Sequence, residues 1–189
     1  MNRIYNCLLL LCIAIALPAW AQDTPAATHS DYEINAGDTL EVSVWKEEDL
    51  QREVLVRPDG KFTFPLAGEI TAKGRTIAYI RAELESRLSR FIPDLVVTVT
   101  ITNVSGNRIF VIGQVKSPGS FIMNPVLDVM QALSLAGGTT PFASLNDIRI
   151  LRREDDIQRA IRFDYTDVSK GRSLGQNILL QSGDIVVVP

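Results

Sequence analysis

Residues 34–44 have the sequence INAGDTLEVSV, and this stretch decides how the folded part of the chain begins. The Gly37-Asp38 pair is typical of a tight turn, and the residues that follow alternate between apolar and polar. Because successive side chains of a strand point to opposite faces, every second residue is expected to face the core. The core-facing residues are then Leu40, Val42 and Val44.

The same pattern recurs near the other end of the sequence. Residues 180–188 have the sequence LQSGDIVVV, with Gly183-Asp184 again placed directly before apolar strand residues. Nearly the whole folded length separates the two copies, so we interpret them as a shared turn and not as a solenoid repeat. Asp38 and Asp184 are expected to accept hydrogen bonds from nearby backbone N–H groups.

A second turn signal follows the first strand. Pro58-Asp59-Gly60 combines a fixed φ at proline with a glycine that tolerates positive φ. It lies between the β-rich segments 54–56 and 62–64, so the sequence predicts a hairpin there. A further short strand is predicted over residues 69–72.

The spacing of apolar residues then changes from every second residue to every third or fourth residue. Thr76 is a suitable N-cap for a helix over residues 76–91, and Pro93 prevents its continuation. The apolar residues of the helix are Ile77, Ile80, Leu84, Leu88 and Phe91. A β-branched strand over residues 95–104 completes a first α+β unit.

The turn Ser105-Gly106-Asn107 starts a second unit. Strands are predicted over 108–115 and 120–123, joined by a turn that contains Pro118 and Gly119. Asn124 is predicted to cap a helix that has Pro125 at its first position and ends at Gly137-Gly138.

The remaining strands of the second unit are predicted over 148–152, 160–165 and 185–188. Arg152 and Arg153 precede Glu154, Asp155 and Asp156 between the first two of them. A cluster of mixed sign is typical of a solvated turn, and we interpret it so.

The scarcity of histidine and cysteine restricts the catalytic, metal-binding and disulfide chemistry of the folded part. The only histidine is His29 and the only cysteines are Cys7 and Cys12, so all three precede the first predicted strand. This excludes Ser-His-Asp and Cys-His catalysis, zinc sites built on imidazole or thiolate, and disulfides in the folded part. We expect no cofactor and no metal. The net charge of −3 gives no general attraction to nucleic acid.

The N-terminus has the pattern of a signal peptide over residues 1–21. Arg3 precedes an apolar run, and Ala19 and Ala21 form an A-x-A cleavage site with Gln22 as the first mature residue. Cys12 lies inside the apolar run and not at its end, so we do not expect a lipoprotein. Residues 22–31 are small and polar and predict a flexible lead-in.

Several segments together resemble one family. In chain order they are YEINAGDTLEVSVW (32–45), VRPDGKFTFPLAGEI (56–70), PDLVVTV (93–99), VIGQVKSPGSF (111–121), LSLAGGTT (133–140) and GDIVVVP (183–189). Their order and spacing resemble the bacterial outer-membrane polysaccharide export family. The resemblance implies an α+β fold of two small domains, a polysaccharide export domain over 32–105 and a soluble-ligand-binding (SLBB) β-grasp domain over 106–189.

The resemblance also implies a function. Such a protein would be a periplasmic, non-enzymatic component of a capsule or exopolysaccharide export machine, assembled as a ring of identical subunits. Its partners would be the exopolysaccharide, an outer-membrane β-barrel and an inner-membrane polysaccharide co-polymerase. The chain resembles the short class of the family, without a C-terminal membrane helix.

Two other functions remain open from the residues alone. The first is a carbohydrate-binding module without a transport role, in which Trp45 could stack on a sugar ring. The simpler interpretation of Trp45 is packing at the strand end. A glycan hydrolase needs only two carboxylic acids, for which Glu47, Glu48 and Asp49 are candidates. These three acids are contiguous, and nothing in the sequence holds two of them at a catalytic separation.

Overall fold

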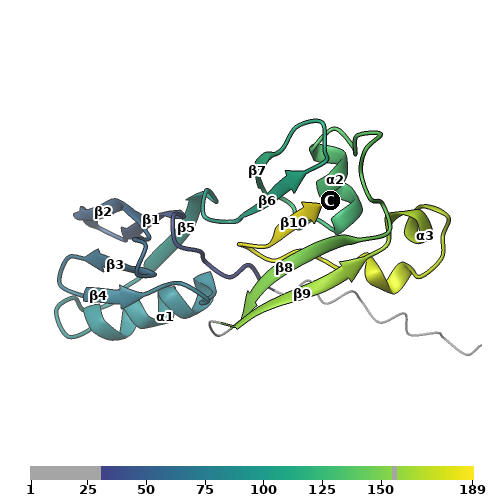
Figure 1. Ribbon diagram of the computed structural model, residues 1–189. Helices are drawn as coiled ribbons and strands as arrows, with labels where there is room; N and C mark the ends of the chain where they lie inside the picture. The colour runs from purple at the N-terminus through teal and green to yellow at the C-terminus, as the bar shows by residue number, and fades with distance from the viewer. Residues whose placement is uncertain (1–30, 155–156) are drawn as a thin grey trace, which may run out of the picture. The chain divides into compact units, whose positions relative to one another are not determined.

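The computed structural model describes residues 31–154 and 157–189, which form two small α+β domains, as predicted (Figure 1). Each domain has its own hydrophobic core. The buried residues of the first core lie between Ile34 and Val99, and those of the second between Ile109 and Val188. The predicted signal peptide, with Ala19, Ala21 and Gln22, lies outside the described residues.

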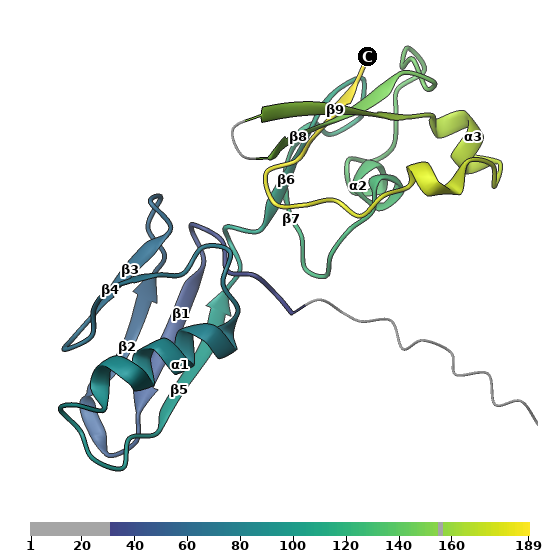
Figure 2. The ribbon, with the colours of Figure 1, turned by 90° about the horizontal axis from the view of Figure 1, so that it is seen from below.

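The first domain contains two antiparallel sheets and one long helix. Its elements are β1 (Thr39–Val44), β2 (Glu47–Leu55), β3 (Lys61–Phe64), β4 (Gly68–Thr71), α1 (Ile77–Leu88) and β5 (Val97–Asn103). The larger sheet has the order β2-β1-β5, and β3 pairs with β4 alone. Helix α1 covers one face of the larger sheet (Figure 2).

The strand predicted after Gly37-Asp38 is confirmed as β1. Its residues alternate between buried and partly exposed, and Leu40, Val42 and Val44 all face the core. Strand β1 is central in its sheet, and these side chains share one buried cluster with residues of α1. The opposite face of β1 carries Thr39, Glu41 and Ser43, and no helix of residues 31–154 and 157–189 belongs to the core on that side.

The hairpin predicted around Pro58-Asp59-Gly60 is wrong in its strand partners. The turn itself forms, because Gly60 N–H donates to Arg57 O at 2.8 Å. However, β2 pairs with β1, with Val54 opposite Leu40, and β3 pairs with β4. Strand β2 is nine residues long and pairs with β1 over most of its length, so its ladder forms with a strand earlier in the sequence and not with the adjacent segment.

Helix α1 begins as predicted and ends earlier. Thr76 Oγ1 accepts a hydrogen bond from Tyr79 N–H at 3.3 Å, which confirms the N-cap. Ile80, Leu84 and Leu88 are buried, but the helix ends at Leu88 and Phe91 is 52% exposed. Pro93 disfavours helical conformation at the residue before it, so the chain leaves the helix a turn before the proline.

The second domain contains a mixed five-stranded sheet of order β7-β6-β10-β8-β9. Its strands are β6 (Arg108–Gly113), β7 (Gly119–Ile122), β8 (Ile148–Glu154), β9 (Ile157–Phe163) and β10 (Ile185–Val188). Its helices are α2 (Val129–Leu135), α3 (Tyr165–Ser169) and the 3₁₀ helix η1 (Leu174–Gln176). Strand β10 runs parallel to β6 and antiparallel to β8.

The start of α2 differs from the prediction. Asp128, and not Asn124, is the N-cap: its carboxylate accepts from Gln131 N–H at 2.8 Å, while Gln131 Oε1 accepts from Asp128 N–H at 2.9 Å. This reciprocal capping box satisfies two N-terminal donors, which Asn124 and Pro125 do not do. The helix ends as predicted, since Gly138 N–H donates to Leu133 O at 2.9 Å.

Among the described residues, helices cover one face of the five-stranded sheet. Helix α2 packs on that face, where Ile109, Val111, Ile150 and Val186 are buried (Figure 2). The alternate residues of the same strands point to the other face, which we call the open face. It carries Phe110 and Ile112 from β6, Leu151 from β8, and Ile185 and Val187 from β10.

Candidate functional site

The two Gly-Asp turns have the same geometry. Asp38 and Asp184 are 0% and 1% exposed, and each carboxylate accepts from the backbone N–H three residues earlier. Asn35 N–H donates to Asp38 Oδ2 at 2.7 Å, and Gln181 N–H donates to Asp184 Oδ2 at 2.9 Å. Gly37 and Gly183 have φ of +97° and +89°, which favours glycine at both positions. The structure thus places all four residues in turns.

Asp38 also binds groups outside its own turn. Tyr32 Oη donates to Asp38 Oδ2 at 2.7 Å, and Gly106 N–H donates to Asp38 Oδ1 at 2.9 Å. Burial, followed by the hydrogen bond to Asp38, raises the pKa of Tyr32. A Cβ atom at Gly106 would collide with the carbonyl oxygen of Ala36. The carboxylate therefore organises a packed turn and is not available to a ligand.

Asp184 forms a buried ion pair with Arg152. Arg152 Nε lies 3.0 Å from Asp184 Oδ1 and Nη2 lies 2.7 Å from Oδ2, so the pair is bidentate. The Arg152 side chain is only 11% exposed, and its hydrogen bonds to Asp184 raise the pKa of the guanidinium. The interpretation of Arg152 as part of a solvated turn is therefore wrong. Its partner lies far away in sequence, on the loop before β10.

The turn at Pro58-Asp59-Gly60 carries an exposed charge network. Arg57 donates to Asp59 Oδ2 at 2.9 Å, and Lys61 Nζ donates to Glu69 Oε1 at 2.7 Å. The hydrogen bond from Arg57 lowers the pKa of the Asp59 carboxyl. These groups bind one another across the β3–β4 edge, which accounts for their arrangement without a ligand.

One predicted turn residue belongs to a strand. Gly119 is the first residue of β7 and lies opposite Val111 of β6, so it is not part of the turn that contains Pro118. Gly137 and Gly138 follow α2 with φ of +76° and +83°, as helix-terminating glycines do.

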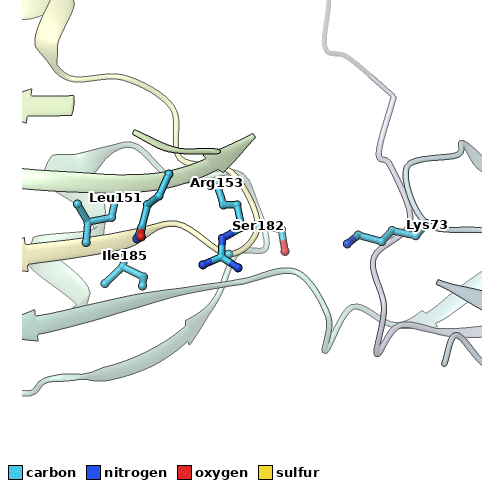
Figure 3. A pocket seen from close by; sticks show the side chains of 7 residues that line it. Lys73, Leu151, Arg153, Ser182 and Ile185 are labelled. Atoms are coloured by element: carbon cyan, nitrogen blue, oxygen red, sulfur yellow. The ribbon is translucent and has the colours of Figure 1, made fainter. Parts of the chain in front are cut away.

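The open face of the second domain combines apolar and cationic side chains. Phe110, Ile185 and Leu151 lie in one row across β6, β10 and β8, and Figure 3 shows Leu151 beside Ile185. Arg153 and Ser182 lie beside this row and, with Leu151 and Ile185, line a hollow of about 530 Å³ (Figure 3). The next row holds Ile112, Val187, Arg149 and Arg162.

Trp45 is exposed and does not pack at the strand end. It directly follows β1, the residue is 69% exposed, and it lines a shallow hollow of about 400 Å³ with residues of β1, β2 and β5 and with Val96 before β5. Its backbone N–H donates to Val96 O at 3.0 Å, so the backbone is fixed while the ring faces solvent. Glu47, Glu48 and Asp49 are exposed beside it.

Two family models match consecutive parts of the sequence. The model described as "Polysaccharide biosynthesis/export protein" matches residues 26–102, and the model described as "SLBB domain" matches residues 107–188. The chain belongs to the polysaccharide export family. Its first described domain is thus a polysaccharide export domain and its second an SLBB domain, as the resemblance implied.

Several proteins that are similar to this chain have names that refer to polysaccharide export or production. It is 29% identical to the EPS I polysaccharide export outer membrane protein EpsA of Ralstonia solanacearum, over 69% of this chain and 41% of the relative. It is 25% identical to the exopolysaccharide production protein ExoF of Rhizobium meliloti (strain 1021), over 89% of this chain and 39% of the relative.

The capsule polysaccharide export protein BexD of Haemophilus influenzae is also 25% identical, over 81% of this chain and 42% of the relative. The chain therefore spans less than half the length of these relatives.

Within residues 31–154 and 157–189, no group of three or more His, Cys, Asp or Glu residues could hold a metal ion. The buried acids of the described part, Asp38 and Asp184, are held by backbone N–H groups, Tyr32 and Arg152. In the same part of the chain, no helix is both long and apolar enough to cross a membrane.

Two features of the second domain were not predicted from the sequence, namely the Arg152–Asp184 ion pair and the open face. The partner of Arg152 could not be found locally, because Asp184 lies on another strand connection. The open face could have been found, since Phe110 and Ile112 alternate with the buried Ile109 and Val111 in a predicted strand. A strand with apolar residues on both faces is typical of a sheet covered on both sides.

Proposed function

We propose that this chain is a subunit of an oligomeric conduit that passes capsular or exopolysaccharide toward an outer-membrane β-barrel. The names of the curated relatives support a role in polysaccharide export. The observation that carries the oligomeric part is the open face of the SLBB domain. A sheet face with exposed aliphatic residues gains free energy when a second surface removes it from water.

The proposed occupant of the open face is a second copy of this chain. Arg149 and Arg162 lie in the second row, and Arg153 lies on the same face of β8. Because the whole chain has a net charge of −3, its other surfaces carry the excess of acid. A head-to-tail contact would bring the cationic face of one copy against an acidic face of the next. Contacts of this heterologous kind close into rings when the rotation between copies permits it.

The remaining parts of the proposal are those that the resemblance to the family implies. The chain would be exported by residues 1–21, cleaved before Gln22, and act in the periplasm at the inner face of the outer membrane without lipidation. Residues 22–31 would be the lead-in, followed by the export domain over 32–105 and the SLBB domain over 106–189. An inner-membrane co-polymerase would deliver the polymer.

Deletion of the gene tests the export role. We expect surface polymer to be lost while lipid-linked repeat units are still made, because a conduit acts after synthesis. Normal surface polymer in the deletion strain would contradict the proposal. Catalysis is tested separately: turnover of the polymer by the purified protein that is lost in Glu47→Gln would instead support a hydrolase.

The mass of the purified chain at several concentrations tests the oligomer. We expect a mass above that of one chain, and Ile112→Glu should shift it toward the monomer because Ile112 is 46% exposed on the open face. Ile157→Glu is the matched control, since Ile157 is exposed on β9 and its alternation places it on the other face. A strict monomer that binds glycan would favour the carbohydrate-binding module.

A further inference from the structure

We propose that the hollow beside Trp45 is a saccharide subsite that takes an uncharged hexopyranose unit. The inference deepens the proposed function, since it rests on a polysaccharide being the transported molecule. It adds the residues that contact the sugar and the charge class of the sugar. The support comes from the exposure of Trp45, the polar groups around it and the charge of the β1–β2 hairpin.

The backbone on both sides of the exposed indole ring is fixed. Trp45 N–H is bonded to Val96 O, and the next residue, Lys46, has φ of +66°, so the chain turns sharply directly after the ring. Val96 is itself 56% exposed and lines the same hollow. A flat apolar surface fixed in this way can pack against the C–H groups on one face of a pyranose ring.

Polar side chains surround the apolar surface on the same sheet face. Ser43 of β1 lies opposite Thr98 of β5, which places two hydroxyl groups beside each other. Gln51 of β2 lines the hollow, and its Nε2 donates to Glu41 Oε1 at 3.2 Å, so the amide is oriented. Hydroxyl and amide groups around an apolar platform can bond the equatorial hydroxyls of a sugar.

The charge near the hollow determines the class of sugar. The segment from Glu41 to Glu53 contains five acidic side chains and two basic ones. Glu41 and Glu53 lie opposite each other on neighbouring strands, on the same sheet face as Ser43. This negative potential repels a uronate or another acidic sugar and does not affect a neutral one. The subsite therefore favours an uncharged hexopyranose.

Tryptophan fluorescence tests the subsite directly. The sequence has two tryptophans, Trp20 and Trp45, and the proposed cleavage before Gln22 removes Trp20, so the emission of the mature chain reports Trp45 alone. The probes are cellohexaose, maltohexaose, mannohexaose and a galactohexaose, against a hexauronate of alginate. We expect a saturable change in emission with at least one neutral hexasaccharide, with a Kd on the order of 1 mM, and a weaker response to the hexauronate.

Variants distinguish sugar binding by Trp45 from a purely structural role of this residue. By saturation-transfer NMR, Trp45→Ala should weaken binding by about tenfold and Gln51→Ala by less. Phe142→Ala is the matched control, because Phe142 is an exposed aromatic residue of the other domain, and it should bind normally. Unchanged binding by Trp45→Ala, tighter binding of the hexauronate, or no binding of any neutral hexasaccharide would overturn the inference.

The oligomeric mass of Trp45→Ala distinguishes this inference from the proposed conduit. If the mass equals that of the unmodified chain while sugar binding is lost, the subsite is supported. If the mass falls to that of one chain, Trp45 belongs to a subunit contact and the inference is wrong, although the conduit proposal stands. A monomeric unmodified chain that still binds the neutral sugar would contradict only the conduit.

Discussion

The Arg152 guanidinium holds the Asp184 carboxylate in a bidentate, buried ion pair, with Nε–Oδ1 and Nη2–Oδ2 distances of 3.0 and 2.7 Å. Arg152 Nη2 also donates to Leu179 O at 3.0 Å. The pair therefore connects β8 to both ends of the Gly-Asp turn that precedes β10. Gln181 N–H also donates to Asp184. The carboxylate therefore stabilises its own turn and also binds this turn to β8.

Removal of Arg152 should destabilise the second domain strongly. Arg152→Ala leaves a buried carboxylate without its cation, which costs about 3–5 kcal/mol of the free energy of unfolding. Urea unfolding followed by circular dichroism measures it. Arg153→Ala is the control, because Arg153 is exposed on the same strand and should change the free energy by less than about 0.5 kcal/mol. Equal midpoints for the two variants would show that the pair contributes nothing.

Tyr32→Phe should destabilise the first domain modestly. It removes the hydroxyl that donates to Asp38 at 2.7 Å but keeps the ring, so we expect a loss of about 1 kcal/mol. Asp38→Ala should cost more, because Asn35 N–H and Gly106 N–H lose their acceptor as well. Urea unfolding again provides the measurement. A larger loss in Tyr32→Phe than in Asp38→Ala would contradict this order.

The same tyrosine should make stability depend on pH in the alkaline range. The pKa of Tyr32 is raised in the folded chain above the ordinary value of 10.0, so the folded state retains its phenol proton where the unfolded state loses it. Its contribution is therefore complete below about pH 10 and decreases as the pH rises toward the folded pKa. Unfolding midpoints should fall more steeply above pH 10 in the unmodified chain than in Tyr32→Phe. Parallel pH profiles for the two proteins would refute the assignment.

Gly106→Ala should be among the most damaging small substitutions. A Cβ atom there meets the carbonyl oxygen of Ala36 and Asp38 Oδ1, so the packed turn must move, at a cost of about 1–3 kcal/mol. Gly175→Ala is the control, since a Cβ atom at that position meets no atom within 4 Å. Thermal unfolding of both variants measures the difference. A midpoint for Gly106→Ala equal to that of Gly175→Ala would show that the turn tolerates the methyl group.

Local patterns predicted most elements but not all of their partners. The alternation after Gly37-Asp38 gave β1 correctly, because strand periodicity and turn chemistry are properties of adjacent residues. The hairpin around Pro58-Asp59-Gly60 was wrong, because the choice of partner depends on which strand buries Leu50 and Val54. Capping of α2 was also misplaced, since Asn124 and Asp128 are both acceptable caps and only Asp128 has Gln131 at the reciprocal position.

The candidate site was less predictable than the fold. Trp45 was identified as a residue of interest, but the interpretation of packing at the strand end was wrong, because exposure depends on the turn at Lys46 and on Val96. The interpretation of Arg152 as part of a solvated turn was wrong for a similar reason. Its neighbours in sequence are charged, whereas its ion-pair partner Asp184 is distant in sequence. Side chains that face another segment are determined by tertiary contacts, which residue spacing does not encode.

The central position of β10 has a consequence for how the second domain folds. Strand β10 is the only link between the β6–β7 pair and the β8–β9 pair within the five-stranded sheet. Until residues 185–188 are available, the domain can contain only two separate hairpins and an incomplete core. Because β6 and β10 are far apart in sequence, we expect the closing of the sheet to be slow and late in folding. A chain that crosses a membrane while it is still unfolded would benefit from such a delay.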